Sequence, residues 1–245
     1  MKRGIVNKIV IISTMIFLIV SANAFAEEEA PTASADLGLV STYMWRGWKL
    51  SEDKIVVQPS MSISHKGLGF NAWSSLSSDP SSGDSASETD FTVSYDTNAG
   101  PLGIGIGYIY YDLEQAAPGI EDDFVEDSQE FYLSASYDTI LAPSLTLYRD
   151  FISFPGYYIS LGLGHSIEIA DSINLDFSGA FGYYMVDDDS GLQDGLLSAS
   201  ISIPVTEYIS LSPSVSYSFP LSDDAEDFLG HSGEVFGGVV LSFSF

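Results

Sequence analysis

The chain has 245 residues, of which 45% are hydrophobic and 13% aromatic, and its 34 acidic against eight basic side chains give a formal net charge of -26. A surface with that charge repels nucleic acid, and the aromatic content argues against a disordered chain. The sequence has no cysteine, which excludes disulfides and a lipid-modified amino terminus. The fold must therefore rest on backbone pairing and side-chain packing.

The amino terminus has the pattern of an export signal. Three basic residues come before or at the start of an apolar run over Ile9–Val20, and Ala24-Phe25-Ala26 supplies a small-x-small end. This arrangement is typical of a secretory signal peptide, and the run is about half of the roughly 20 residues that a spanning helix needs. We expect a signal peptide over residues 1–26, a short periplasmic segment over 27–34 and one folded domain over 35–245.

The rest of the chain alternates apolar residues with small or polar ones, and we find no stretch of helical period after the signal peptide. Tyr157, Ile159, Leu161 and Leu163 fall on one face of such a segment, with Ser, Gly and Glu residues on the other. This period of two predicts β-strands. Similar segments cover residues 37–45, 55–65, 69–76, 89–96, 102–111, 130–138, 145–151, 157–169, 172–185, 195–205, 208–219 and 234–245.

The connections between these segments decide between a soluble sandwich and a membrane barrel, because both have alternating strands. Connections after even-numbered segments are short, whereas several after odd-numbered ones are long and acidic, at residues 77–88, 112–129, 186–194 and 220–233. Outer-membrane barrels combine short periplasmic turns with longer outer loops. We predict an all-β, transmembrane, antiparallel up-and-down barrel of about twelve strands in a bacterial outer membrane, with both ends periplasmic.

The location implies partners. The barrel is expected to contact outer-membrane lipid and lipopolysaccharide, and the ending VVLSFSF, which finishes in Phe245, resembles the signal that outer-membrane assembly machinery reads. No nucleic acid is expected as a partner.

Two stretches resemble a known group. Val40-Ser41-Thr42-Tyr43-Met44-Trp45-Arg46-Gly47 is similar to a Val-Ser-x-Tyr-x-x-Arg-Gly signature on the first strand of small bacterial outer-membrane barrels of uncharacterised function. Residues 143–150 together with 156–165 also look similar to such proteins. The resemblance implies a fold and a location, and it carries no known activity.

Catalytic and metal sites have little support in the sequence. A barrel hydrolase needs a His base beside a nucleophile or an activated water, and His65, His165 and His231 lie in no such motif. Asp187, Asp188 and Asp189 come nearest to a calcium loop but lack its spacing. We predict no enzyme activity and no cofactor, and we interpret the acidic clusters as solvated loops.

The lumen offers the remaining candidates. Arg46 is expected to line the mouth as a determinant of ion preference, or else to pair with a loop carboxylate or with lipopolysaccharide. Arg149 and Asp150 are adjacent on a strand, so one of them must be at the rim or inside. The remaining residues expected to line the lumen or mouth are Gln58, Asp90, Tyr111, Tyr132, Tyr148 and Tyr158.

These features leave two main functions open. A narrow porin-like channel would pass small solutes or cations by passive diffusion. A non-conducting structural or interaction barrel would use its acidic outer loops, and its lumen would be closed if the four tyrosines, Tyr111, Tyr132, Tyr148 and Tyr158, meet at one level. A membrane-embedded hydrolase is the third alternative.

Overall fold

The structure, a computed structural model, describes residues 30–51, 55–77, 87–113, 127–153, 155–186 and 189–245. The expected signal peptide lies outside the described residues. Among the residues described, no helix has the length and apolarity needed to span a bilayer.

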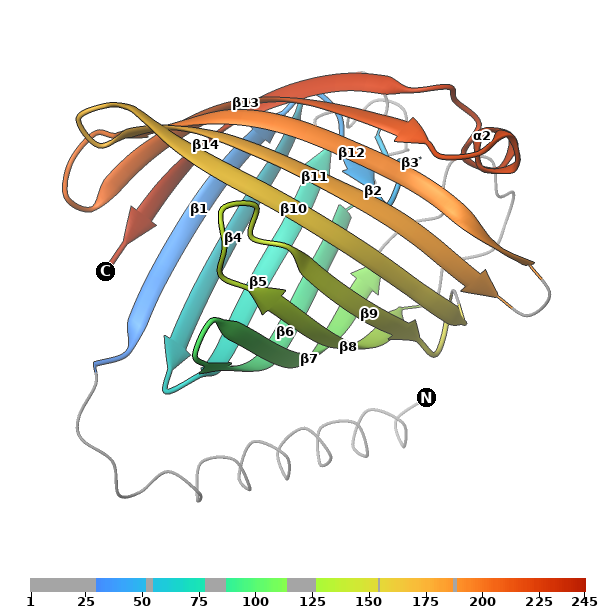
Figure 1. Cartoon of the computed structure of the whole chain (residues 1–245), viewed down its shortest axis with the longest axis horizontal. Coiled ribbons are helices and arrows are strands. Elements are labelled where there is room, and N and C mark those ends of the chain that lie inside the picture. The colour runs from blue at the N-terminus through green and yellow to red at the C-terminus, as the bar shows by residue number, and fades with distance from the viewer. Residues whose placement is uncertain (1–29, 52–54, 78–86, 114–126, 154, 187–188) are drawn as a thin grey trace. The chain divides into compact units, whose positions relative to one another are not determined.

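Twelve antiparallel strands close into a barrel, and the first strand pairs with the last (Figure 1). Around the barrel the order is β1, β14, β13, β12, β11, β10, β9, β8, β7, β6, β5 and β4. The bounds are β1 (Thr32–Val40), β4 (Val56–His65), β5 (Leu68–Ser77), β6 (Ser87–Ala99), β7 (Leu102–Leu113), β8 (Ser128–Tyr137), β9 (Ser144–Asp150), β10 (Gly156–Ala170), β11 (Ile173–Val186), β12 (Asp189–Pro204), β13 (Ile209–Pro220) and β14 (Glu234–Ser244). The predicted fold class, including the number of strands, is confirmed.

Closure follows from the alternating pattern. Ile104, Ile106, Leu133 and Leu161 belong to a large set of exposed apolar side chains on the outer face of the barrel. The residues between them point inward and are mostly small or polar. Such a barrel has an apolar exterior that suits lipid, and pairing β1 with both β14 and β4 leaves no open edge of unpaired backbone groups.

One end of the barrel carries tight turns, as predicted. Between β4 and β5, Lys66 and Gly67 both have positive φ, 50° and 82°. Two such residues make the mirror-image turn whose twist matches a two-residue hairpin. A Cβ on Gly67 would also lie 2.4 Å from the backbone oxygen of Asp96, so only glycine fits. We call this the short-turn end and the opposite one the long-loop end.

Three predictions about element bounds were wrong. β1 covers Thr32–Val40 rather than 37–45, so it begins within the segment expected to precede the barrel. β12 starts at Asp189, because most of the acidic stretch predicted as a loop over 186–194 pairs with β11. A helix, α2 (Asp223–Leu229), lies in the loop between β13 and β14, where no helix was expected.

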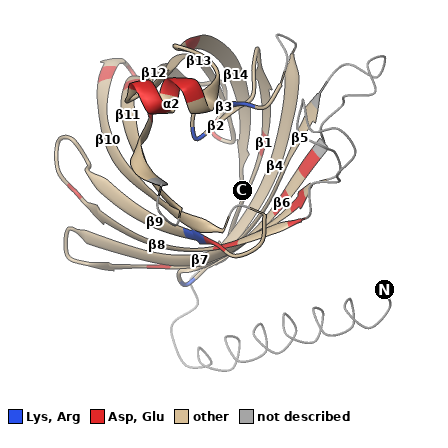
Figure 2. Cartoon of the chain, turned by 90° about the vertical axis from the view of Figure 1, so that its right-hand side faces the viewer, with Lys and Arg blue, Asp and Glu red and all other residues tan. Residues whose placement is uncertain are grey.

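α2 is defined by its two ends. Ser222 caps it, with its side chain accepting a hydrogen bond from the Ala225 N–H, and Gly230 ends it with φ 75°. Ala225 and Leu229 are buried. Seen from the long-loop end, α2 lies within the outline of the barrel beside two short strands, β2 (Met44–Trp45) and β3 (Trp48–Lys49) (Figure 2).

Candidate functional site

The segment after β1 folds into the barrel. It forms a small hairpin from β2 (Met44–Trp45) and β3 (Trp48–Lys49), closed by Arg46 and Gly47 at φ 48° and 84°. We call residues 41–51 the inner hairpin. The motif that resembles the first-strand signature of bacterial barrels thus begins at the last residue of β1 and builds this hairpin, instead of lying on a membrane-crossing strand as predicted.

Gly47 shows how closely the inner hairpin is packed. An added Cβ would lie 2.8 Å from the Cβ of Asp194 on β12 and 2.8 Å from a methyl group of Leu229 on α2. Positive φ and this lack of space both favour glycine. The turn of the hairpin is therefore held between the barrel wall and α2.

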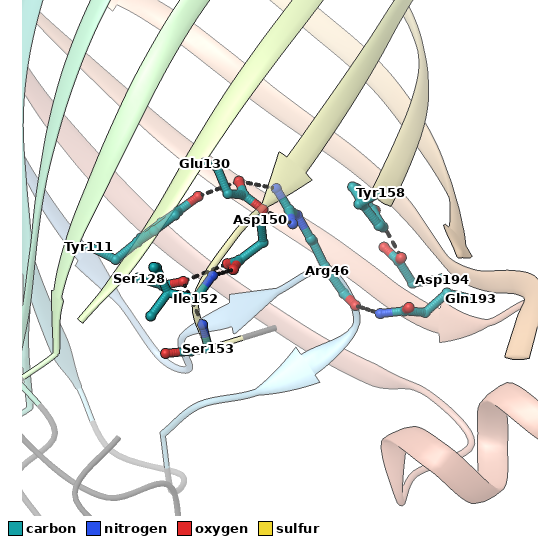
Figure 3. Close-up of polar contacts among 10 residues, drawn as sticks. All are labelled: Arg46, Tyr111, Ser128, Glu130, Asp150, Ile152, Ser153, Tyr158, Gln193 and Asp194. Atoms are coloured by element: carbon teal, nitrogen blue, oxygen red, sulfur yellow. Dashed lines mark hydrogen bonds and ion pairs between the residues drawn. The ribbon is translucent and has the colours of Figure 1, made fainter. Parts of the chain in front are cut away.

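Arg46 anchors the hairpin to the opposite wall (Figure 3). Its two terminal nitrogens donate to the two carboxylate oxygens of Glu130 on β8, at 2.7 and 2.8 Å. The Arg46 and Glu130 side chains are 11% and 1% exposed. Tyr111 on β7 also donates to Glu130, at 2.8 Å. Planar, two-point pairing of this kind is the strong form of a charge-assisted hydrogen bond.

Aromatic rings surround the same guanidinium. The Cζ of Arg46 lies 4.5 Å from the ring centre of Trp45, 4.5 Å from that of Tyr148 and 4.3 Å from that of Tyr158. Burial lowers the pKa of Arg46, but hydrogen bonding to Glu130 and its charge raise that pKa by more, so the net shift is upward. Arg46 therefore stays a buried cation that is paired with Glu130 and lies among aromatic rings.

Further contacts hold the hairpin to β12, to β14, and to α2 and the segment that follows it. The Gln193 amide donates to the Arg46 carbonyl at 2.8 Å, and a ring nitrogen of His231 lies 2.7 Å from the Gly47 carbonyl. Lys49 pairs with Glu234 on β14 at 3.1 Å. Trp48 meets Phe228 of α2 edge to face at 4.8 Å. The inner hairpin and α2 thus form one assembly in the long-loop mouth.

A cavity of about 290 Å³ lies between this assembly and the barrel wall. Its lining is aromatic on several sides and polar on the others: Trp45, Arg46, Trp48, Glu130, Asp150, Gly156, Tyr158, Tyr184, Gln193 and Phe228. Within the cavity wall, Asp150 accepts from the Ser128 hydroxyl at 2.6 Å and from the Ile152 N–H at 2.8 Å. Tyr158 donates to Asp194 at 2.9 Å.

The short-turn half of the lumen has a different lining. Exposed Phe91 and Tyr95 fix the outward face of β6, so Ser94 and Asp96 point inward. Asp36 and Asp176 also face inward, and each aspartate accepts a hydrogen bond from a serine hydroxyl, at 2.9 to 3.3 Å. Glycine and serine dominate the positions between them. This half combines little side-chain bulk with negative charge.

The structure brings most of the predicted lumen residues together. Arg46 and Tyr111 both bind Glu130, and Arg46 also lies over the ring of Tyr158. The rings of Tyr132, Tyr148 and Tyr158 form a chain with centroids 5.7 and 6.1 Å apart. Tyr132, Tyr148 and Tyr158 are register partners on neighbouring strands of the wall, and the last two contact Arg46. They do not meet one another across the lumen.

Gln58 lies apart from this group, whereas Asp90 on β6 is the register partner of Tyr111 on β7. Gln58 packs beside Gly38. One carboxylate oxygen of Asp90 is buried and has no hydrogen-bond partner among the residues that the structure describes. Tyr43 of the inner hairpin is close to that region, and burial together with the charges of Glu88 and Asp90 raises the pKa of Tyr43 well above 10.0.

Arg149 and Asp150 point to opposite faces of the barrel wall, as their adjacent positions on a strand predict. Asp150 is buried inside, whereas Arg149 lies on the outer face over the rings of Tyr157 and Phe151, at 4.6 and 5.6 Å. Glu130, Gln193 and Asp194 were not singled out from the sequence. Inward parity with Tyr132 was the available signal for Glu130, but Gln193 and Asp194 lay in a predicted loop.

The described residues that were considered as catalytic or metal-binding candidates do not come together in a site. His165 contacts the Ile140 carbonyl and His231 the Gly47 carbonyl, so both of these rings bond to backbone, and His65 is exposed at the end of β4. Asp187 and Asp188 lie outside the described residues. Among the residues that are described, no group of three or more His, Asp or Glu side chains is placed to hold a metal ion.

Comparisons with known proteins agree with the fold. A family model described as a bacterial protein of unknown function (Gcw_chp) matches residues 25–195, and no curated protein matches the chain. The solved KdgM porin is similar at a TM-score of 0.58 and 12% identity, over 86% of this chain and 99% of that one.

Two further structures are less similar. An outer membrane channel from Pseudomonas putida F1 gives a TM-score of 0.49 at 12% identity, over 91% of this chain and 98% of the other. The Salmonella typhi outer membrane phospholipase, solved as a dimer with bound calcium, gives 0.46 at 14% identity, over 90% and 93%. At these identities the similarity concerns the fold.

Proposed function

The chain belongs to the Gcw_chp family of bacterial proteins of unknown function, and we propose that it is a narrow passive-diffusion channel of the outer membrane for small cationic or neutral solutes. The similarity to the KdgM porin supports the barrel type. The proposed location places the short-turn end in the periplasm. The apolar outer face meets lipid and lipopolysaccharide, and Phe245 at the end of β14 is the contact for the assembly machinery.

The lining of the short-turn half carries this proposal. A barrel that serves only as a wall has no need to keep its interior small and polar, yet here serine and glycine surround Asp36, Asp96 and Asp176. Small polar side chains leave room for water. Inward carboxylates favour cations over anions.

The inner hairpin supplies the constriction. It lies within the barrel and is fixed by the buried pair between Arg46 and Glu130, so solutes entering from outside must pass it. Constrictions made by segments folded into a barrel select by size and charge. We therefore expect this channel to be narrow for its number of strands.

Solute uptake into liposomes tests the proposal. The refolded mature protein is inserted into vesicles, and swelling rates are measured for neutral and charged solutes of increasing size. In a second variant, residues 42–50 are replaced by a short Gly-Ser linker, which should raise the size limit. As a control, residues 139–142 at the short-turn end are replaced in the same way, and this change should leave the limit unaltered.

A non-conducting barrel is the second candidate, and a specific observation favours it. Trp48 and Phe228 pack against each other across the long-loop mouth, and this contact narrows the entrance. If folded, inserted protein gave no swelling with any solute while the linker variant did, the barrel would be closed in its resting form. The acidic loops would then be the part that meets partners.

A further inference from the structure

The mouth cavity, which is enclosed by the inner hairpin, α2 and the barrel wall, has the features of a binding site for a solute. We propose that it binds a small organic cation, such as a quaternary ammonium or a guanidinium compound. The inference deepens the proposed function, because it names the class of solute that the channel would select. Its test is a binding measurement, which needs no transport.

The size of the cavity limits the ligand. At about 290 Å³ it is at the lower end of the range found for small-molecule sites. It holds a molecule of amino-acid size. A polymer or a lipid chain does not fit within it.

The aromatic lining determines the kind of ligand. Trp45 and Trp48 come from the inner hairpin, Phe228 from α2, and Tyr158 and Tyr184 from the wall. Faces of this kind on several sides attract either the apolar face of a sugar or an organic cation, which binds to the negative π-face of a ring.

The polar lining separates these two possibilities. Both terminal nitrogens of Arg46 bind Glu130, the Gln193 amide binds the Arg46 carbonyl, and Asp150 accepts from Ser128 and Ile152. A sugar needs several directed hydrogen bonds to its hydroxyl groups, and much of the hydrogen-bonding capacity of these side chains is already used within the protein. A cation needs only rings and negative potential.

The charge of the lining points the same way. Glu130 and Asp150 are negative and Arg46 is positive, so the lining has a formal charge of -1, and all three side chains are largely withdrawn from water. Low local dielectric strengthens the attraction for a cation and the repulsion of an anion.

Arg46 shows that aromatic rings at this end of the barrel already bind a cation. Its guanidinium sits within 4.5 Å of the ring centres of Trp45, Tyr148 and Tyr158. Tyr158 and Trp45 belong to the cavity lining as well. The same end of the barrel therefore already holds one organic cation, supplied by its own chain, next to the space available for a second.

Calorimetric titration of the refolded mature protein tests the proposal. The probes are choline, its uncharged carbon analogue 3,3-dimethylbutan-1-ol, glucose and gluconate. A polyoxyethylene detergent is used because its headgroup has neither charge nor sugar, with 0.15 M salt to screen the acidic loops. Choline should bind about tenfold more tightly than its analogue, with weaker binding of glucose and gluconate.

Variants then place the binding in the cavity. Trp45→Leu on the hairpin and Tyr184→Leu on the wall should each weaken choline binding about fivefold or more. The matched control is Trp73→Leu, since Trp73 packs against Tyr43 and does not line the cavity. The Tyr184 variant guards against a shift of the hairpin, because Tyr184 belongs to a barrel strand.

Three results would overturn the proposal. Equal affinity for choline and its analogue would remove the role of charge, and tighter binding of glucose would indicate a carbohydrate site. If both cavity variants bound choline with the affinity of the wild type, the binding site would lie outside the cavity, in the acidic loops. Choline binding without any channel activity would refute the diffusion channel and leave the site in place.

Discussion

Replacing Glu130 by Gln is predicted to release the inner hairpin from the barrel. The pair between Arg46 and Glu130 has side-chain exposures of 11% and 1%. Removing one partner of a buried pair costs about 3–5 kcal/mol, because the other charge stays buried without compensation. At 1.4 kcal/mol for each factor of ten, the population of released hairpin should rise about 10²- to 4 × 10³-fold.

Limited proteolysis with trypsin measures this release directly. The inner hairpin contains two cleavage sites, after Arg46 and after Lys49, which Glu130→Gln leaves intact. When opening and closing are fast compared with cleavage, the cleavage rate follows the open population. The variant should therefore be cut within the hairpin about 10²- to 4 × 10³-fold faster than the wild type, while the barrel stays folded.

Glu234→Gln provides the comparison. Its pair with Lys49 also holds the hairpin, but the two side chains are 28% and 25% exposed, and such pairs contribute about 1 kcal/mol or less. Cleavage should rise by no more than about fivefold. Equal cleavage rates for the Glu130 variant and the wild type would refute the reasoning that the buried pair anchors the hairpin.

Three other changes test separate parts of the structure. Gly47→Ala places a Cβ 2.8 Å from Asp194 and Leu229 at a positive φ, so the docked hairpin should lose about 1–3 kcal/mol of stability and trypsin should cut it faster. A cleavage rate equal to that of the wild type would contradict this packing. Changing Asp36, Asp96 and Asp176 together to Asn should move the reversal potential in a salt gradient toward zero, whereas Asp138→Asn with Asp171→Asn at the turns should have less effect; no shift would place selectivity elsewhere. The pKa of Tyr43 is raised in the folded protein, so its contribution to stability is present below its unfolded pKa of about 10 and is lost as pH rises through the higher folded value. The free energy of unfolding, measured with urea, should therefore fall less steeply above a pH of about 10 in Tyr43→Phe than in the wild type. Equal slopes would show that the pKa of Tyr43 does not change on folding.

The barrel itself was readable from the sequence because its pattern is repeated. Alternation fixes which residues face lipid, and a shift by one residue would reverse every face of a strand. The bounds of β4 and β5, for example, follow closely from the two-residue turn at Lys66-Gly67. Inward parity also singled out Tyr111 and Tyr158, which lie beside the pair of Arg46 and Glu130.

The inner hairpin was not readable in the same way. Met44 to Lys49 continues the aromatic pattern of a strand, and nothing local shows that the chain leaves the wall at Val40. The two positive φ angles at Arg46 and Gly47 arise from a turn held by Asp194, Leu229 and Glu130. Those partners are distant in sequence. Pairing across 84 residues is a property of the closed barrel, which no local pattern encodes.

The sequence did not predict α2 for a related reason. Seven residues are too few to establish a helical period, and its acidic sequence resembles a solvated loop. Its formation depends on the Ser222 cap and on burial of Ala225 and Leu229, which is available once the hairpin lies beneath it.

Single-channel recording in a planar bilayer tests the central claim most directly. The refolded mature protein, with insertion verified independently, is studied in symmetric salt for conductance and in a salt gradient for reversal potential. The proposed channel predicts small, steady conductance steps with a preference for cations, and larger steps when Glu130→Gln releases the inner hairpin. Silence from inserted wild-type and variant protein alike would contradict a conducting barrel.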